Sequence, residues 1–214
     1  MNLKVNEIFH SIQGESLYAG LPCLFVRLTG CNLRCSYCDT RYAYEEGRLM
    51  TIEEIIDHLS QYHCRLVEIT GGEPLCQSAT PLLITRLIEK GYTVLLETNG
   101  SKNIRIADSR CRKIVDIKCP GSGESQSNDL ENLNRLSAKD QLKFIITDKQ
   151  DYDYAKNIIH STWTGLCPVP ILFSAAYKVL DPTILAEWIL ADNLDVRLQV
   201  QLHKILWPNE KKGR

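Results

Sequence analysis

The segment Gly30-Cys31-Asn32-Leu33-Arg34-Cys35-Ser36-Tyr37-Cys38-Asp39-Thr40 carries three cysteines with the spacing C-x3-C-x2-C, and no fourth cysteine stands beside them. An iron–sulfur cluster that only carries electrons is usually held by four thiolates. A cubane held by three leaves one iron open, and an open metal position is where chemistry can occur. The spacing therefore predicts a 4Fe–4S cluster with one reactive iron, held by Cys31, Cys35 and Cys38.

Two other interpretations of the cysteine trio stay open at this point. A structural zinc site needs four ligands, usually from two paired C-x2-C elements. Only one such pair exists here, so His63 or Cys64 would have to complete the site. Chance clustering in a cysteine-rich chain is the other alternative.

The composition favours one globular domain over residues 1–214. Apolar residues make up 44% of the 214 and charged residues 24%, with a net charge of −1. No broad basic field is implied, so we expect no nucleic-acid or membrane surface, and Lys211–Arg214 is interpreted as a solvated tail. No stretch approaches the roughly 20 apolar residues of a membrane helix. The N-terminus lacks the apolar core of a signal peptide, which predicts a cytoplasmic protein.

Six further cysteines bring the total to nine, an odd number that excludes complete intramolecular pairing. We expect each of them to be a small buried hydrophobic residue. They are Cys23, Cys64, Cys76, Cys111, Cys119 and Cys167.

Strand-like and helix-like segments alternate along the chain, which predicts parallel βαβ units. The expected strands are Leu24–Leu28, Leu66–Thr70, Thr93–Thr98, Lys113–Lys118, Gln141–Thr147, Pro170–Ser174 and Val196–Leu202. The expected helices are Thr51–Leu59, with Thr51 and Glu54 as a capping box, Pro81–Lys90, Asp129–Ala138, Gln150–His160 and one beginning at Asp181-Pro182. The strands are rich in Val, Ile and Leu, as is typical of strands buried on both faces.

About six or seven units fall short of the eight of a closed barrel. The predicted α/β fold is therefore an open, partial (β/α) barrel of six or seven parallel strands, with a doubly wound sheet as the alternative. The link from Gly100 to Arg112 is barely long enough for a crossover and should lack a full helix. Either architecture places the active site at the carboxyl ends of the strands. The cysteine segment, Gly71-Gly72-Glu73-Pro74, Glu97-Thr98-Asn99, Asp116, Lys118, Ser174, Gln201 and His203 all follow or end predicted strands.

The cysteine segment, with an aromatic residue before its last cysteine, and the Gly-Gly-Glu-Pro element together resemble the radical S-adenosylmethionine superfamily. A double glycine after a strand is by itself only a turn. The resemblance implies that S-adenosylmethionine chelates the open iron and is cleaved by an electron from the cluster to a 5′-deoxyadenosyl radical. It also implies an external electron donor of flavodoxin or ferredoxin type. The cofactor pocket would be formed by Tyr37, Cys38, Asp39, Gly72, Glu73, Asp116, Ile117, Lys118 and Ser174.

Within this superfamily, the sequence resembles the 7-carboxy-7-deazaguanine synthase family. The segments that carry this resemblance are residues 9–15, 19–22, 25–28, 38–40 and 197–204. That resemblance implies contraction of 6-carboxy-5,6,7,8-tetrahydropterin to 7-carboxy-7-deazaguanine with loss of ammonia, on the route to queuosine, by a homodimer. Mg²⁺ would bind Thr40. The substrate would contact Ile12, Gln13, Gly14, Glu15, Arg27, Thr70 and His203.

Each of these residues has an alternative role that involves no ligand. Arg27 would be a surface ion pair, Gln13 and Glu15 part of a solvated loop, and Thr70 an ordinary strand-end residue. Asp39-Thr40 would be a turn or cap, and His203 a structural histidine. For the whole protein, the alternatives are an activase of a glycyl-radical enzyme, which the Asp116-Ile117-Lys118 element also resembles, and a simple electron carrier.

Overall fold

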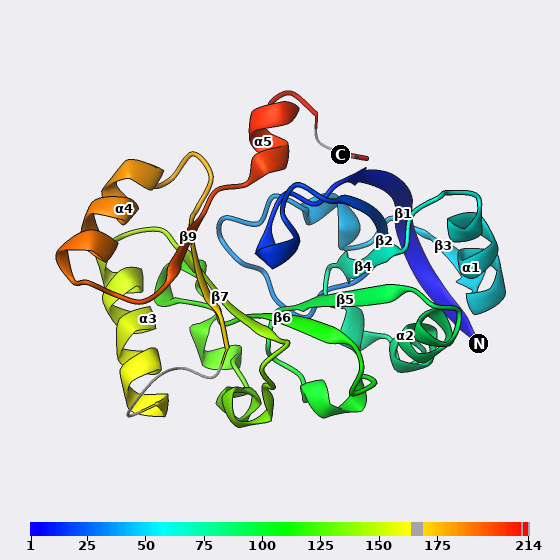
Figure 1. The fold of residues 1–214 in the computed structure, drawn as a ribbon, viewed down its shortest axis with the longest axis horizontal. Helices are drawn as coiled ribbons and strands as arrows, with labels where there is room; N and C mark the ends of the chain where they lie inside the picture. The colour runs from blue at the N-terminus through cyan, green and yellow to red at the C-terminus, as the bar shows by residue number, and fades with distance from the viewer. Residues whose placement is uncertain (164–168, 211, 214) are drawn as a thin grey trace.

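The computed structural model describes residues 1–163, 169–210, 212 and 213, and these form a nine-stranded sheet of order β3-β1-β2-β4-β5-β6-β7-β8-β9 (Figure 1). The strands are β1 (Asn2–Ile12), β2 (Pro22–Leu28), β3 (Arg48–Thr51), β4 (Leu66–Gly71), β5 (Thr93–Thr98), β6 (Arg112–Asp116), β7 (Gln141–Ile146), β8 (Ile171–Ala175) and β9 (Arg197–Gln199). The sheet curves without closing, so the predicted open partial barrel is confirmed.

Strand β2 and the six strands β4 to β9 are parallel to one another. This confirms the prediction of six or seven parallel strands at its upper value of seven. The sequence reading missed β1 and β3, which extend the sheet in antiparallel orientation beyond β2. The alternating burial of β1 is interrupted by an irregularity between Val5 and Glu7, which obscures its period of two.

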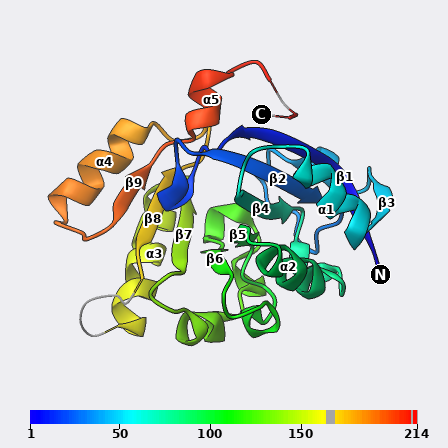
Figure 2. The same cartoon turned by 45° about the vertical axis from the view of Figure 1, so that its right-hand side comes forward.

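The helices α1 (Ile52–Ser60), α2 (Thr80–Glu89), α3 (Lys149–Thr162) and α4 (Pro182–Ala191) lie along the convex side of the sheet (Figure 2). The capping box at the start of α1 is confirmed, because the Thr51 hydroxyl accepts from the Glu54 amide and the Glu54 carboxylate accepts from the Thr51 amide. Asp181 caps α4 as predicted.

Two predicted elements differ from the structure. The segment predicted as a helix over Asp129–Ala138 forms only a 3₁₀ helix at Leu130–Arg135. The last strand ends at Gln199, and the chain turns into the short helix α5 (Leu202–Leu206), so His203 lies on a helix. The link before β6 contains only a 3₁₀ turn at Ile104–Ile106, as expected.

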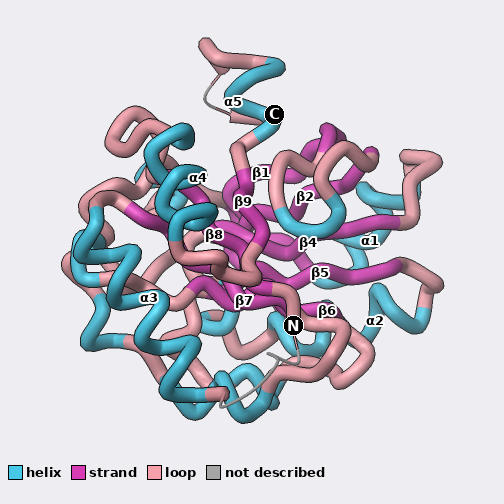
Figure 3. Tube along the Cα trace, turned by 60° about the vertical axis from the view of Figure 1, so that its left-hand side comes forward, coloured by secondary structure: helices cyan, strands magenta, loops and turns pink. Residues whose placement is uncertain are grey.

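The two faces of the parallel sheet differ in chemistry. The convex face carries the apolar core, including Val26, Ile69, Leu96, Val115 and Phe144. Alternate positions on the same strands carry polar side chains toward the concave face: Arg27, Glu68, Thr70, Glu97, Asp116, Lys143, Ser174 and Gln199. The strands are buried on both faces, as expected, and Figure 3 shows the helices outside the strand layer.

A loop of residues 13–21, here called the crossing loop, spans the open side of the barrel. Its Ser16 amide donates to Gln199 Oε1 on β9 at 2.6 Å, and its Leu17 amide donates to Gln141 Oε1 on β7 at 2.9 Å. The Leu202 amide donates to Gly14 O at 3.0 Å. The first and last parts of the sheet are thus joined across the concave face.

The scattered cysteines follow the prediction with one exception. Cys23, Cys64, Cys111 and Cys119 are buried, whereas Cys76 is exposed, because it ends a 3₁₀ turn on the surface beside Asn32. Cys167 lies outside the described residues. Among the described helices, none is long and apolar enough to cross a membrane.

Candidate active site

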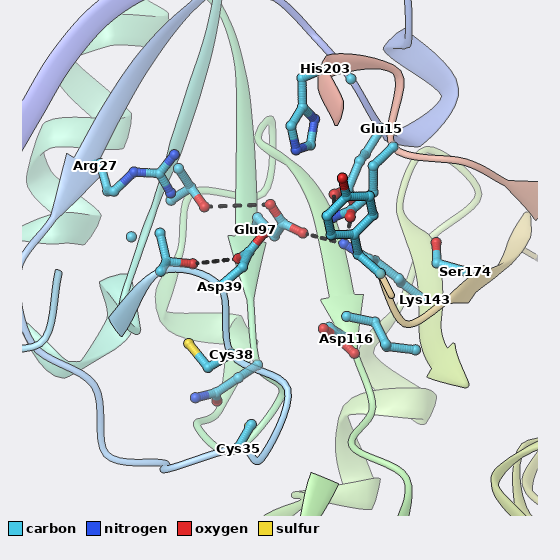
Figure 4. A pocket seen from close by; sticks show the side chains of 18 of the residues that line it. Glu15, Arg27, Cys35, Cys38, Asp39, Glu97, Asp116, Lys143, Ser174 and His203 are labelled. Atoms are coloured by element: carbon cyan, nitrogen blue, oxygen red, sulfur yellow. Dashed lines mark hydrogen bonds and ion pairs between the residues drawn. The ribbon is translucent and has the colours of Figure 1, made fainter. Parts of the chain in front are cut away.

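The concave face and the loops at the carboxyl ends of the strands enclose a cavity of about 260 Å³ (Figure 4). Most of the side chains predicted for the site line it. They are Ile12, Gln13, Gly14, Glu15, Arg27, Cys31, Cys35, Tyr37, Cys38, Asp39, Thr40, Thr70, Gly72, Asp116, Lys118, Ser174 and His203. Two predicted residues, Glu73 and Ile117, are fully buried and do not line the cavity.

The cysteine loop is fixed by hydrogen bonds from both of its sides. Ser36 donates through its hydroxyl to Gly121 O at 2.7 Å and through its amide to Ser122 O at 3.0 Å. Gly121 is in turn held by Asp151, whose carboxylate accepts from the Gly121 amide at 2.7 Å. The guanidinium groups of Arg34 and Arg41 donate to carbonyl oxygens of the same loop.

Without a metal, the thiols of Cys31 and Cys35 are protonated near pH 7. Burial raises the pKa of Cys31 and Cys35, while the Lys118 ammonium acts in the opposite direction. Metal binding requires thiolates, so loading a metal must release these protons. Among the described residues, no three His, Cys, Asp or Glu side chains converge closely enough to hold a single ion. The ligands of a cubane bind different irons and stand farther apart, which suits this arrangement better than a single zinc ion does.

The two glycines at the end of β4, Gly71 and Gly72, allow the backbone to pack against the cysteine loop. A Cβ on Gly72 would collide with Gly30 O and Cys31 Cβ, and Gly71 has a φ of +136°, which favours glycine. The Glu73 carboxylate accepts from the Thr98 hydroxyl and from the Leu75 and Asn99 amides. Glu73 therefore ties the end of β4 to the end of β5 and faces away from the cavity.

The cysteine end of the cavity offers buried polar atoms to a ligand. Lys118 Nζ pairs with Asp116 Oδ2 at 2.6 Å, and both side chains line the cavity. Within the described part of the chain, Asp116 Oδ1 and the Tyr37 hydroxyl are buried without a hydrogen-bond partner. S-adenosylmethionine carries hydroxyl, amino and carboxylate groups that would satisfy such atoms, so the residues present fit this cofactor.

The middle of the cavity holds a network of charged groups. Lys143 Nζ donates to Glu97 Oε1 at 2.8 Å and to Glu15 Oε2. Gln13 Nε2 donates to Glu68 Oε2 at 2.5 Å. Gln13 is only 3% exposed, so the alternative of a solvated loop is wrong for this residue.

The far end of the cavity is built around Arg27 and Thr40. Arg27 Nε pairs with Glu7 Oε1 at 2.7 Å, and the two side chains are only 15% and 16% exposed, so the pair is not a surface contact. Thr40 stands at the start of a 3₁₀ turn but makes no side-chain capping bond. Its hydroxyl instead donates to Asp39 Oδ1 at 3.0 Å, and Asp39 pairs with Lys204 at 2.8 Å.

His203 lies over the crossing loop. A Cβ on Gly14 would collide with His203 Nδ1, so a glycine is needed for this close approach. Burial lowers the pKa of His203 against the opposing effect of Glu15, which leaves the imidazole neutral at pH 7. Ser174 accepts from Gln199 Nε2 at 3.2 Å at the edge of the cavity.

Comparison with known proteins agrees with these features. Residues 25–119 match the Radical SAM superfamily. The chain is 42% identical over 225 aligned positions to the 7-carboxy-7-deazaguanine synthase of Koribacter versatilis, covering 99% of this chain and 100% of that one. It is 43% identical to the 7-carboxy-7-deazaguanine synthase of Chlorobaculum tepidum, covering 99% and 97%. The chain belongs to the 7-carboxy-7-deazaguanine synthase family.

A solved structure supports the same assignment. The crystal structure of QueE from Escherichia coli superposes with a TM-score of 0.76 at 25% identity, covering 95% of each chain. As a member of the 7-carboxy-7-deazaguanine synthase family, the protein is a radical S-adenosylmethionine enzyme, and this membership implies a 4Fe–4S cluster and S-adenosylmethionine.

Several residues that the sequence reading did not assign to the site also line the cavity of this family member. They are Phe9, Phe25, Tyr42, Tyr44, Glu68, Lys143, Tyr177, Lys204 and Glu210. Glu68 and Lys143 could have been found from the sequence, because each of them interrupts an otherwise apolar strand.

Proposed function

We propose that the protein converts 6-carboxy-5,6,7,8-tetrahydropterin to 7-carboxy-7-deazaguanine with release of ammonia. The observation that carries this proposal is the cavity itself, in which the cysteine loop and Arg27 open onto one space across a floor of polar strand residues. A flat, hydrogen-bonding pterin with one carboxylate suits such a surface, since its ring needs polar partners and its carboxylate a cation.

At one end of the cavity, Cys31, Cys35 and Cys38 would hold the cluster. Tyr37, Asp39, Gly72, Asp116, Lys118 and Ser174 would surround S-adenosylmethionine, with Ile117 contributing through its backbone. Cluster and S-adenosylmethionine together supply the 5′-deoxyadenosyl radical that removes a substrate hydrogen. The protein's own part is to bind, to orient and to exclude water.

At the other end, Arg27 would bind the substrate carboxylate with its planar cation. Glu7 fixes the orientation of Arg27 through Nε, and the rings of Phe9 and Tyr42 flank it with 5.7 Å and 5.9 Å from guanidinium carbon to ring centre. Ile12, Gln13 and Gly14 would contact the pterin from the crossing loop, with Glu15, Thr70 and His203 around it.

Thr40 would provide a ligand to Mg²⁺ that bridges to the substrate. Magnesium prefers oxygen ligands and usually takes only one or two from the protein. The absence of a capping bond from the Thr40 side chain supports this role over that of a helix cap. Lys204 lowers the pKa of Asp39 although burial raises it, which keeps a carboxylate beside the proposed ion.

Residues 1–214 would act as a single domain that receives electrons from a flavodoxin- or ferredoxin-type donor and functions as a homodimer. Size-exclusion chromatography with light scattering tests the dimer directly. A monomer at micromolar concentration would contradict it.

The decisive experiment is anaerobic reconstitution with iron and sulfide, followed by reduction in the presence of S-adenosylmethionine, the pterin and Mg²⁺. We expect charge-transfer absorbance, 7-carboxy-7-deazaguanine and ammonia. Reductive cleavage of S-adenosylmethionine without product would favour the glycyl-radical activase instead. The variant Thr40→Ala should weaken the response to Mg²⁺ at unchanged iron content, and an unchanged response would contradict the Thr40 assignment.

A further inference from the structure

Two carboxyl groups share the floor of the cavity. In the register of β4 and β5, Glu68 lies opposite Leu95, so Glu97, two residues farther on, points to the same concave face as Glu68. Both side chains line the cavity, and the charge of Glu97 acts on Glu68. Two buried carboxyl groups this close do not both ionise, because like charges disfavour each other, so one of them carries a proton. Lys143 approaches only the Glu97 member of the pair within bonding distance, at 2.8 Å (Figure 4).

The surroundings decide which carboxyl is neutral. Burial raises the pKa of Glu68 well above its ordinary value, and the nearby charges of Glu97 and Glu15 add to the effect. Burial also acts on Glu97, but the ammonium groups of Lys143 and Lys118 outweigh it and lower the pKa of Glu97. Glu68 is 4% exposed, whereas the Glu97 side chain is 26% exposed toward the cavity.

The groups that face the pair come from every side of the barrel. Gln13 and Glu15 approach from the crossing loop, Thr70 from β4 at 3.4 Å from Glu97 Oε2, Lys118 from the end of β6 and Lys143 from β7. None of them is a predicted metal ligand. The pair is therefore an acid and its carboxylate base held side by side, with the base open to the ligand space.

We propose that Glu97 is a catalytic residue that exchanges protons with the substrate, and that Glu68 is a positioning residue that holds the shared proton for it. This proposal rests on the proposed function. Conversion of the pterin to the product loses one ammonia and no net electrons. Once the carbon skeleton has rearranged, the carbon–nitrogen bond breaks with its electron pair on nitrogen, and nitrogen takes one proton to leave as ammonia. A ring carbon gives up one proton as the new double bond forms.

The pair can serve both steps without an external acid or base. It delivers one proton to the leaving nitrogen and receives one from the ring carbon, so it returns to its starting state after each turnover. A single carboxylate held by Lys143 would be a poor proton donor near pH 7, because its pKa is lowered. The buried neutral partner supplies the missing proton.

The test compares Glu68→Gln and Glu97→Gln with the control Glu89→Gln, which changes an exposed residue of α2 that pairs with Arg86. Glutamine keeps the shape and a hydrogen-bond donor but holds no transferable proton. With substrate deuterated at its saturated ring carbons, deuterium transfer to 5′-deoxyadenosine reports hydrogen abstraction, and ammonia reports the later steps.

We expect deuterium transfer to persist in both variants, while ammonia release falls about 10²–10⁴-fold in Glu97→Gln and at least about tenfold in Glu68→Gln. In the parent enzyme, the rate of ammonia release should fall at high pH, when Glu68 loses its proton. In Glu68→Gln this fall should be absent. Wild-type ammonia release in Glu68→Gln, or loss of deuterium transfer in both variants, would overturn the proposal.

A second measurement does not depend on the variants folding. In the parent enzyme, D₂O should slow ammonia release but leave hydrogen abstraction unchanged, and equal rates of ammonia release in both solvents would overturn the proposal. If the parent enzyme itself yields no 7-carboxy-7-deazaguanine, the proposed function fails rather than the role of the pair.

Discussion

Replacing Lys143 with methionine should destabilise the protein strongly, because it leaves buried carboxylates without their cation. Lys143 is 4% exposed and pairs with both Glu15 and Glu97. Removing one partner of a buried ion pair costs about 3–5 kcal/mol in the free energy of unfolding. For a chain of this size that corresponds to a decrease of roughly 6–20 °C in melting temperature.

The loss should depend on pH in a defined direction. The pKa of Glu97 is lowered in the folded protein, so its pairing stabilises above its unfolded pKa and is lost as pH falls. Burial alone would lower the pKa of Lys143, but Glu15 and Glu97 raise it well above its ordinary value, so its contribution is lost only at alkaline pH. In Lys143→Met the carboxylates can take up protons, so the difference from the parent should shrink between pH 7.5 and pH 5.

Urea unfolding of the metal-free protein at these two pH values measures the effect. The control Arg86→Met removes an exposed pair of 3.9 Å between side chains more than half exposed, and should change the free energy of unfolding by less than about 0.5 kcal/mol. A loss below about 1 kcal/mol for Lys143→Met at pH 7.5, or one that does not change with pH, would refute the reasoning.

Three further predictions concern separate parts of the molecule. Thr51→Ala removes the capping box of α1 and should lower the free energy of unfolding by about 1 kcal/mol in urea titrations, with no change in iron content. Gly121→Ala adds a Cβ that collides with Thr147 and Asp151, and Gly121 O accepts from Ser36 of the cysteine loop. The reconstituted variant should therefore hold clearly less iron per chain than the parent. Equal iron content would contradict a role of Gly121 in positioning the cysteine loop. Arg27→Lys keeps the charge but loses the planar fork and the Nε bond to Glu7, so KM for the pterin should rise at least about tenfold with kcat less affected; an unchanged KM would exclude Arg27 from carboxylate binding.

The presence of the parallel strands and the rim at which the predicted site residues gather were predictable because both follow from local patterns. Apolar strands alternating with amphipathic helices lead to a parallel sheet, and parallel strands bring their carboxyl ends to one rim. The capping box at Thr51 and the Asp181 cap depend only on neighbouring residues, which is why they could be predicted. The bounds of Thr93–Thr98 agree for the same reason.

The chemistry of the concave face was not predicted, although the sequence carried a signal for it. Single charged residues stand within apolar strands, as in Val67-Glu68-Ile69 and Leu142-Lys143-Phe144, and we interpreted those strands as buried on both faces. Their period of two becomes meaningful only when the curvature of the sheet leaves one face without helices. The Glu68–Glu97 pair also depends on the register of two strands, which no local pattern specifies.

The crossing loop has a consequence for the order in which the site can form during synthesis. The part of the cysteine loop around Ser36 is held through Gly121 and Asp151, which lie in the first three quarters of the chain. The opposite end of the cavity needs Gln199 and Leu202, which meet the crossing loop more than 180 residues after it has been made. A nascent chain can therefore form the cysteine end of the cavity before the opposite end exists. The crossing loop cannot make its contacts with Gln199 and Leu202 until these residues have left the ribosome.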